Sequence, residues 1–146
     1  MCVVKRKVDA LVLMGAGLAR KYRNGTASYT YPVPTLTLDG TLDGLYRVTR
    51  QAESYYHQIL HAKDKENAFK MFPVVVYEGV THMQFASGTP PFAVKNADLK
   101  PEVTYDDAHA AMAASMTMFF VDQMGGAASS SVKAQMSVFF PNAQML

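Results

Sequence analysis

Two residues with acid–base chemistry, Asp43 and His82, each follow an apolar segment of the chain. Asp43 comes shortly after residues 33–38, and His82 comes shortly after residues 72–77. An imidazole gains and loses a proton near neutral pH, and a partner on one ring nitrogen determines which nitrogen carries that proton. If the two apolar segments are neighbouring strands, the carboxylate and the imidazole can lie side by side. This pair is therefore the candidate site of the chain.

The composition is that of one globular domain. The 146 residues are 49% hydrophobic and 18% charged, so a substantial core can form. A net charge of +2 gives no electrostatic reason to expect a nucleic acid as partner. The single cysteine, Cys2, excludes an internal disulfide and a Cys-x-x-Cys metal or redox motif, and it suits a reducing compartment.

No targeting or membrane-spanning segment is recognisable. The sequence begins MCVVKRK, which is basic and unlike a signal peptide, and no apolar run reaches the roughly 18 residues of a membrane span. We therefore expect no membrane span, and a cytoplasmic or organellar location is favoured.

Three parallel strands are expected at the centre of the domain. The predicted strands are residues 8–14, 34–38 and 72–77. The first is an almost continuous apolar run, as expected of a strand buried on both faces. A helical segment separates the second strand from the third, so these two form a βαβ unit with a parallel sheet. The predicted fold class is α/β.

Two helices are expected to flank the sheet. The first starts at Leu45, and its apolar residues recur at helical spacing: Leu45, Val48, Ala52, Tyr55, Tyr56 and Ile59. The second follows Thr104 as N-cap and ends at Gly125. Its apolar stripe is Tyr105, Ala108, Met112, Met116, Phe119 and Phe120.

The remaining segments are expected to be loops and terminal extensions. Residues 18–34 and the passage between His82 and Val103 contain several glycines and prolines, which is typical of long loops. Residues 1–7 are predicted to be an N-terminal arm, and residues 125–146 a linker with an apolar tail. The domain proper is then residues 8–124.

The order of these elements resembles the C-terminal half of an α/β-hydrolase. The segment LDGTLD at residues 38–43 is similar to the acid turn of that family, and YEGVTH at residues 77–82 is similar to its histidine turn. Dienelactone-hydrolase-like and lipase- or esterase-like members are the nearest. The resemblance implies a partial α/β-hydrolase fold with about three parallel core strands and flanking helices.

The resemblance also implies a role for each residue of the pair. Asp43 would orient the imidazole, and His82 would be the general base for a serine hydroxyl. Asp39, at the end of the same strand, is the alternative acid. No Gly-x-Ser-x-Gly motif occurs in the sequence. The chain would supply the acid and the histidine of a triad but not the serine, and it is expected to be inactive alone.

Two functions are consistent with this partial triad. The first is that of the C-terminal portion of a serine-type hydrolase that acts on a carboxylic ester or related acyl substrate. The alternative is a non-catalytic, hydrolase-derived structural or interaction subunit of a larger assembly. In both cases the first strand would leave an apolar sheet edge. A missing N-terminal half, another chain or a second copy is expected to cover it.

Two further motifs are weaker candidates. His57 and His61 are four residues apart on a helix and could bind zinc, but Gln58 stands where the zinc motif has glutamate and no third ligand is evident. Residues 15–17, Gly-Ala-Gly, are similar to a dinucleotide-binding loop, but Arg20 stands where a third glycine is expected. We therefore expect neither a metal nor a cofactor.

Overall fold

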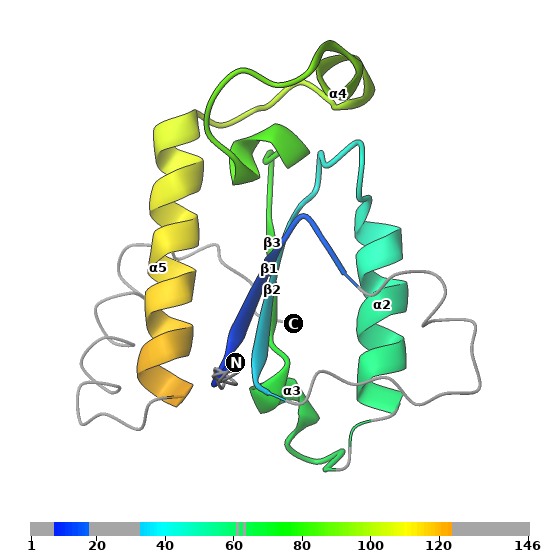
Figure 1. Ribbon diagram of the computed structural model, residues 1–146, viewed down its shortest axis with the longest axis vertical. Coiled ribbons are helices and arrows are strands. Elements are labelled where there is room, and N and C mark those ends of the chain that lie inside the picture. The colour runs from blue at the N-terminus through cyan, green and yellow to red at the C-terminus, as the bar shows by residue number, and fades with distance from the viewer. Residues whose placement is uncertain (1–7, 18–32, 61, 63, 124–146) are drawn as a thin grey trace, which may run out of the picture.

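A parallel three-stranded sheet with helices on both faces forms the centre of the protein (Figure 1). The computed structural model describes residues 8–17, 33–60, 62 and 64–123. The strands, in the order β1-β2-β3, are β1 (Leu11–Met14), β2 (Thr35–Gly40) and β3 (Val74–Tyr77). The helices are α2 (Val48–Leu60), α3 (Ala68–Met71), the 3₁₀ helix η1 (His82–Phe85), α4 (Phe92–Ala97) and α5 (Tyr105–Gln123).

The sheet is the middle of three layers. Helix α5 lies on one side of it, α2 lies on the other, and α4 lies beyond the end of the sheet (Figure 1). Both strand pairs are parallel, with Leu38 opposite Met14 in β1 and opposite Val75 in β3. The expectation of an α/β fold with three parallel strands and flanking helices is confirmed.

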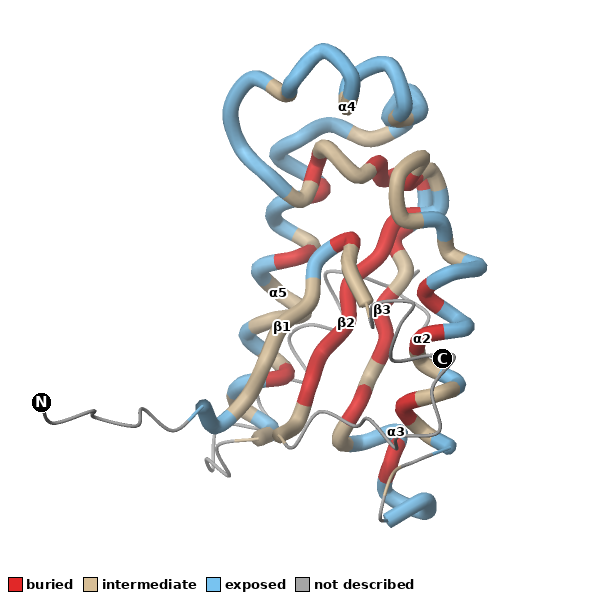
Figure 2. The backbone as a smooth tube through the Cα atoms, turned by 45° about the vertical axis from the view of Figure 1, so that its right-hand side comes forward, coloured by how far each residue is buried: buried red, intermediate tan, exposed pale blue. Residues whose placement is uncertain are grey.

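The core is formed where β2 and β3 face α5. Every residue of β2 is buried, as its central position requires (Figure 2). Side chains alternate between the two faces of a strand, so Leu36 and Leu38 point to the same face. The buried residues that pack together on it are Leu36, Leu38, Val75, Tyr77, Val80, Ala108, Met112 and Phe119.

The N-cap predicted for α5 is confirmed. The backbone N–H of Asp107 donates to Thr104 Oγ1 at 3.1 Å, which satisfies one of the amides at the start of the helix that have no partner within it. The predicted stripe is buried at Ala108, Met112 and Phe119.

The prediction that the first strand is buried on both faces is wrong. Residues 11–13 are half-buried, and Met14 is 42% exposed. Within the described residues β1 pairs only with β2, so it is an edge strand there. The edge position itself agrees with the expectation that the first strand leaves a sheet edge; what differs is the burial of its faces.

The apolar stripe predicted for α2 is not its buried face. The buried residues of this helix are Gln51, Ser54 and Gln58, whereas Tyr56 is 61% exposed. The orientation of the helix is set by packing against its surroundings. A methyl group on Gly17 would lie 2.7 Å from Ser54 Oγ. The absence of a side chain at Gly17 therefore allows the polar face of α2 to lie close to the backbone at this residue.

The passage between His82 and Val103 is not one long loop, because it contains η1 and α4. Pro91 is the N-cap residue of α4 and its carbonyl accepts bonds from Val94 and Lys95. Proline is well tolerated at a helix start because its fixed φ suits the first turn. The predictions for residues 1–7, 18–32, 61 and 124–146 lie outside the described residues.

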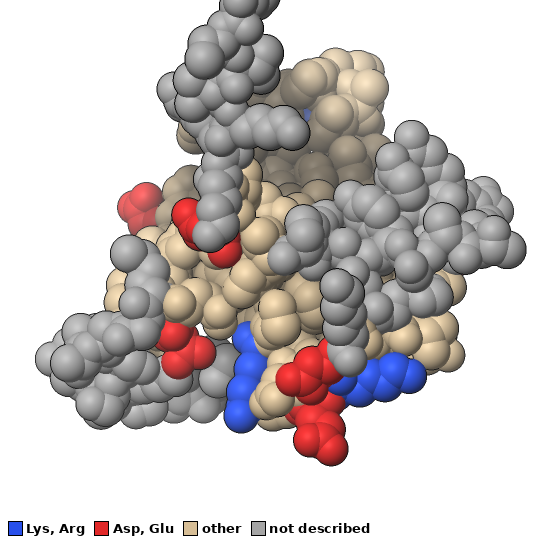
Figure 3. All heavy atoms as spheres, turned by 60° about the horizontal axis from the view of Figure 1, so that its bottom comes forward, with Lys and Arg blue, Asp and Glu red and all other residues tan. Residues whose placement is uncertain are grey.

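No helix in the described ranges is long and apolar enough to cross a membrane. On the face seen from the α3 end, basic and acidic side chains are interspersed (Figure 3).

Candidate functional site

The candidate site lies where the parallel strands end. Because carboxyl ends of parallel strands meet at one edge, the turn after β2 and the turn after β3 are neighbours. Backbone hydrogen bonds join the two turns beyond the strands: Thr41 N–H donates to Tyr77 O at 3.0 Å and Leu42 N–H donates to Val80 O at 3.0 Å. The sheet register thus brings the acid and the histidine together.

Asp43 and His82 are in direct contact. His82 Nδ1 lies 2.8 Å from Asp43 Oδ2. The other carboxylate oxygen, Oδ1, accepts the backbone N–H groups of Leu45 at 2.9 Å and Tyr46 at 2.6 Å. An ionised carboxylate only accepts, so the neutral ring carries its hydrogen on Nδ1 and leaves Nε2 as an acceptor.

Burial differs between the two members of this dyad. The carboxylate of Asp43 is fully buried, whereas 29% of the His82 side chain is exposed. The acid is therefore held in place below the imidazole, and the imidazole has an outward-facing part. An oriented ring with an accessible acceptor nitrogen can remove a proton from a hydroxyl group that is brought to it.

Asp39, the alternative acid, forms no hydrogen bond with the imidazole. Its Oδ1 accepts the N–H of Gly40 at 2.9 Å, and its buried Oδ2 has no partner among the described residues. Burial raises the pKa of Asp39 to about 7, and the negative charge of Asp43 contributes in the same direction. Asp43 is thus the partner of His82, and Asp39 is a buried acid beneath the same turn.

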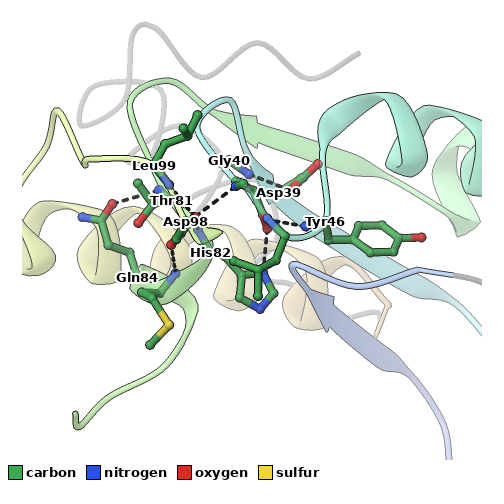
Figure 4. A network of polar contacts seen from close by, with 12 residues as sticks. Asp39, Gly40, Tyr46, Thr81, His82, Gln84, Asp98 and Leu99 are labelled. Carbon is green, nitrogen blue, oxygen red and sulfur yellow. Dashed lines mark hydrogen bonds and ion pairs between the residues drawn. The ribbon is translucent and has the colours of Figure 1, made fainter. Parts of the chain in front are cut away.

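Two polar residues that we did not predict, Gln84 and Asp98, hold the histidine turn (Figure 4). The fully buried Gln84 accepts the N–H of Thr81 at 3.0 Å and donates through Nε2 to Val103 O at 3.0 Å. Asp98 accepts the N–H of Met83 at 2.8 Å. Gln84 is the last residue of a Thr-x-x-Gln capping box that begins at Thr81, a sequence signal that we did not use. Asp98 belongs to no motif, so the sequence carried no signal for it.

The other two candidate motifs lie partly outside the described residues, which exclude Arg20 and His61. No group of three potential metal ligands occurs within the described residues, and His61 is outside them. Gly15 and Gly17 instead make room for side chains of the chain itself: an added methyl group would lie 2.9 Å from His82 Nδ1 at Gly15, and 2.4 Å from the hydroxyl of Tyr46 at Gly17.

Replacing Gly15 by alanine is expected to separate the dyad. The new methyl group would lie 2.9 Å from His82 Nδ1 and 3.1 Å from Asp43 Oδ2, and the φ of +54° is unfavourable for a residue with a side chain. We expect a loss of about 1–2 kcal/mol of stability from the backbone, together with loss of the Nδ1 proton signal in NMR spectra.

The matched control is Gly88→Ala. Gly88 also has a positive φ, of +96°, but an added methyl group meets nothing within 4 Å. In chemical denaturation, this variant should lose only the stability that the positive φ costs a residue with a side chain. Its NMR spectrum should keep the His82 Nδ1 proton signal. An unchanged His82 signal in Gly15→Ala would contradict the packing described above.

A groove lies between the end of β1, η1 and α5. Its volume is about 350 Å³ and its lining includes Met14, Phe85, Met112 and Met116, with His109 as a polar residue. Met14 immediately precedes Gly15, and Phe85 is the last residue of η1, which starts at His82. The groove is therefore mainly apolar and lies between elements that adjoin the dyad in the sequence, but neither Asp43 nor His82 lines it.

Comparisons of the chain with protein-family models, with curated proteins and with solved structures find no match. The functional conclusion depends on the geometry of the site.

Proposed function

We propose that this chain is the C-terminal portion of a serine-type α/β-hydrolase that acts on a carboxylic ester or related acyl substrate. The observation that carries the proposal is the 2.8 Å contact between His82 Nδ1 and the buried carboxylate of Asp43. The carboxylate is itself fixed by two backbone N–H groups. The three parallel strands would be the last three core strands of the hydrolase sheet.

The reaction would use His82 first as base and then as acid. A serine from outside these 146 residues would lose its hydroxyl proton to His82 Nε2 while its oxygen attacks the acyl carbon. The imidazolium would then give that proton to the leaving alcohol. Asp43 would remain ionised and would stabilise the imidazolium through Nδ1.

The position of β1 supports this arrangement. Its last residue, Met14, is followed by Gly15, whose α-carbon lies against the dyad. A further parallel strand paired with the outer edge of β1 would end next to the imidazole. A serine at the end of such a strand would be placed to meet Nε2.

The groove between β1, η1 and α5 favours an acyl substrate. Its apolar lining, which includes three methionines, suits the hydrocarbon part of an ester. A charged substrate would lose its hydration there without a partner of opposite charge. This favours an uncharged ester over a phosphate ester.

A non-catalytic interaction subunit is the second candidate. The half-buried β1 and the exposed Met14 favour it, because an apolar sheet edge is a surface on which another chain can pair. In that case the dyad would be inherited from a hydrolase and would serve only the fold.

Labelling with a fluorophosphonate distinguishes the two functions. The tagged chain would be isolated from its source with whatever polypeptide or partner carries it, and the isolate treated with the probe. We expect labelling of a serine outside these 146 residues, and loss of labelling in His82→Gln because no base activates the serine.

The control is His57→Gln, a histidine on α2 that contacts the ring of Tyr56 and should not affect labelling. The 146-residue chain alone should remain unlabelled. Labelling that persists in His82→Gln would overturn the hydrolase proposal. Absence of labelling in the intact assembly would leave the interaction subunit as the function.

A further inference from the structure

The carboxylate of Asp98 binds backbone amides from both turns of the site. Asp98 follows the last residue of α4 and its side chain is half-buried. Oδ1 accepts the N–H of Gly44 at 3.0 Å and that of His82 at 3.3 Å. Oδ2 accepts the N–H of Met83 at 2.8 Å.

These amides belong to the neighbours of the dyad in the sequence. Gly44 follows Asp43, and Met83 follows His82. One carboxylate therefore connects the backbone that carries the acid to the backbone that carries the base (Figure 4). Hydrogen bonds from amides to an ionised carboxylate are roughly twice as strong as those between neutral groups, so this connection is well suited to fix the separation of the two turns.

Backbone packing at Gly44 supports the same role independently. A methyl group on Gly44 would lie 2.4 Å from Ala97 O and 2.9 Å from Asp98 Cα. The turn that contains Asp43 thus lies directly against the segment that contains Asp98, and only a residue without a side chain allows this approach. The contact does not depend on the charge of Asp98.

We propose that Asp98 is a positioning residue that sets the geometry of the Asp43–His82 hydrogen bond. It acts through the backbone of the two turns and makes no contact with the imidazole ring that would let it take part in proton transfer. Its consequence for catalysis rests on the proposed hydrolase function. Its effect on the geometry of the dyad is independent of that function.

The test is Asp98→Asn in the full 146-residue chain. Asparagine has the same shape as aspartate but only one acceptor oxygen. Its NH₂ group would therefore point either at the N–H of Met83 or at the N–H groups of Gly44 and His82, and two hydrogen-bond donors would face each other. We expect the exchange of the His82 Nδ1 proton with water to become about 10-fold faster. The measurement is ¹H–¹⁵N NMR of the imidazole.

Two further variants separate positioning from a general loss of structure. Asp64→Asn is the matched control, because the exposed Asp64 also accepts a backbone N–H, that of Asn67 at 3.2 Å; it should leave the His82 signals unchanged. Gly44→Ala displaces the Asp98 segment without changing any charge and should reproduce the faster exchange. Amide spectra establish that each variant is folded.

The outcomes for geometry and for function are distinct. A wild-type His82 exchange rate in folded Asp98→Asn would overturn the positioning role. If positioning holds and the assembly is a hydrolase, fluorophosphonate labelling should fall by up to about 100-fold in Asp98→Asn, the size of effect known for small displacements of reacting groups. Faster proton exchange in an assembly that no probe labels would uphold the positioning role and reject the hydrolase.

Discussion

If the proposed hydrolase function holds, replacing Asp43 by asparagine is expected to lower serine labelling of the assembly by about 10⁴-fold, the loss known for this change in Ser-His-Asp enzymes. The amide oxygen of asparagine can still accept the N–H groups of Leu45 and Tyr46, which Asp43 Oδ1 accepts now. Its NH₂ group would then face His82 Nδ1. The ring would move its hydrogen to Nε2, which could no longer accept a proton from the serine. The rate of fluorophosphonate labelling measures the effect.

The same variant makes a second prediction for the 146-residue chain alone. Imidazole ¹⁵N spectra should show the hydrogen on Nε2 in Asp43→Asn and on Nδ1 in the wild type. Circular dichroism should show the helices retained in both. A labelling rate within a few-fold of wild type, with the tautomer changed as expected, would mean that His82 is not the base.

Replacing Asp39 by asparagine is expected to stabilise the fold at pH 8 and to have no such effect near pH 4. Burial raises the pKa of Asp39 from its ordinary value of 3.8 to about 7. Between these values the folded chain holds a proton that the unfolded chain has lost, so the contribution of Asp39 to stability falls as the pH rises. The full shift corresponds to about 4 kcal/mol. Solvent near the end of the sheet screens part of this energy, so we expect Asp39→Asn to stabilise the fold at pH 8 by about 2–3 kcal/mol.

Denaturant unfolding of both proteins across pH 4 to 8 measures this difference. The oxygen of asparagine can keep the bond to Gly40 N–H, and its NH₂ group would replace the buried oxygen that lacks a described partner. Asp64→Asn is a control in which the stability should change in the opposite direction. Hydrogen bonds from the side chain and backbone of Asn67 lower the pKa of Asp64, so this variant should lose stability at pH 8. A stability difference for Asp39→Asn that is independent of pH would contradict the raised pKa.

The dyad could be anticipated from the sequence because it depends on topology. Asp43 and His82 each follow an apolar segment, and a helix of suitable length lies between them. Parallel pairing of β2 with β3 then places both residues at one edge, whatever the finer packing. The same reasoning could not choose between Asp39 and Asp43. That choice depends on the turn after Gly40, which directs the carboxylate of Asp43 toward the ring.

Gln84 could have been anticipated from its capping box with Thr81, but Asp98 could not, because it acts across contacts that no local pattern records. Asp98 reaches Gly44 across 54 positions of the sequence, and its own surroundings, a short helix after two prolines, resemble a loop. The orientation of α2 was missed for a related reason. Its apolar stripe was identified, but close approach at Gly17 rather than burial of the stripe determines which face is turned inward.

The bridge made by Asp98 bears on the order in which the chain folds. It joins residues near positions 44, 83 and 98, so it can close only after the crossover from β2 to β3 has formed and α4 has docked. Contacts between such distant residues require loop closure and therefore form late. The acid–base geometry would then be absent from partly folded chains, and an ordered imidazole would mark the completion of folding in this sheet.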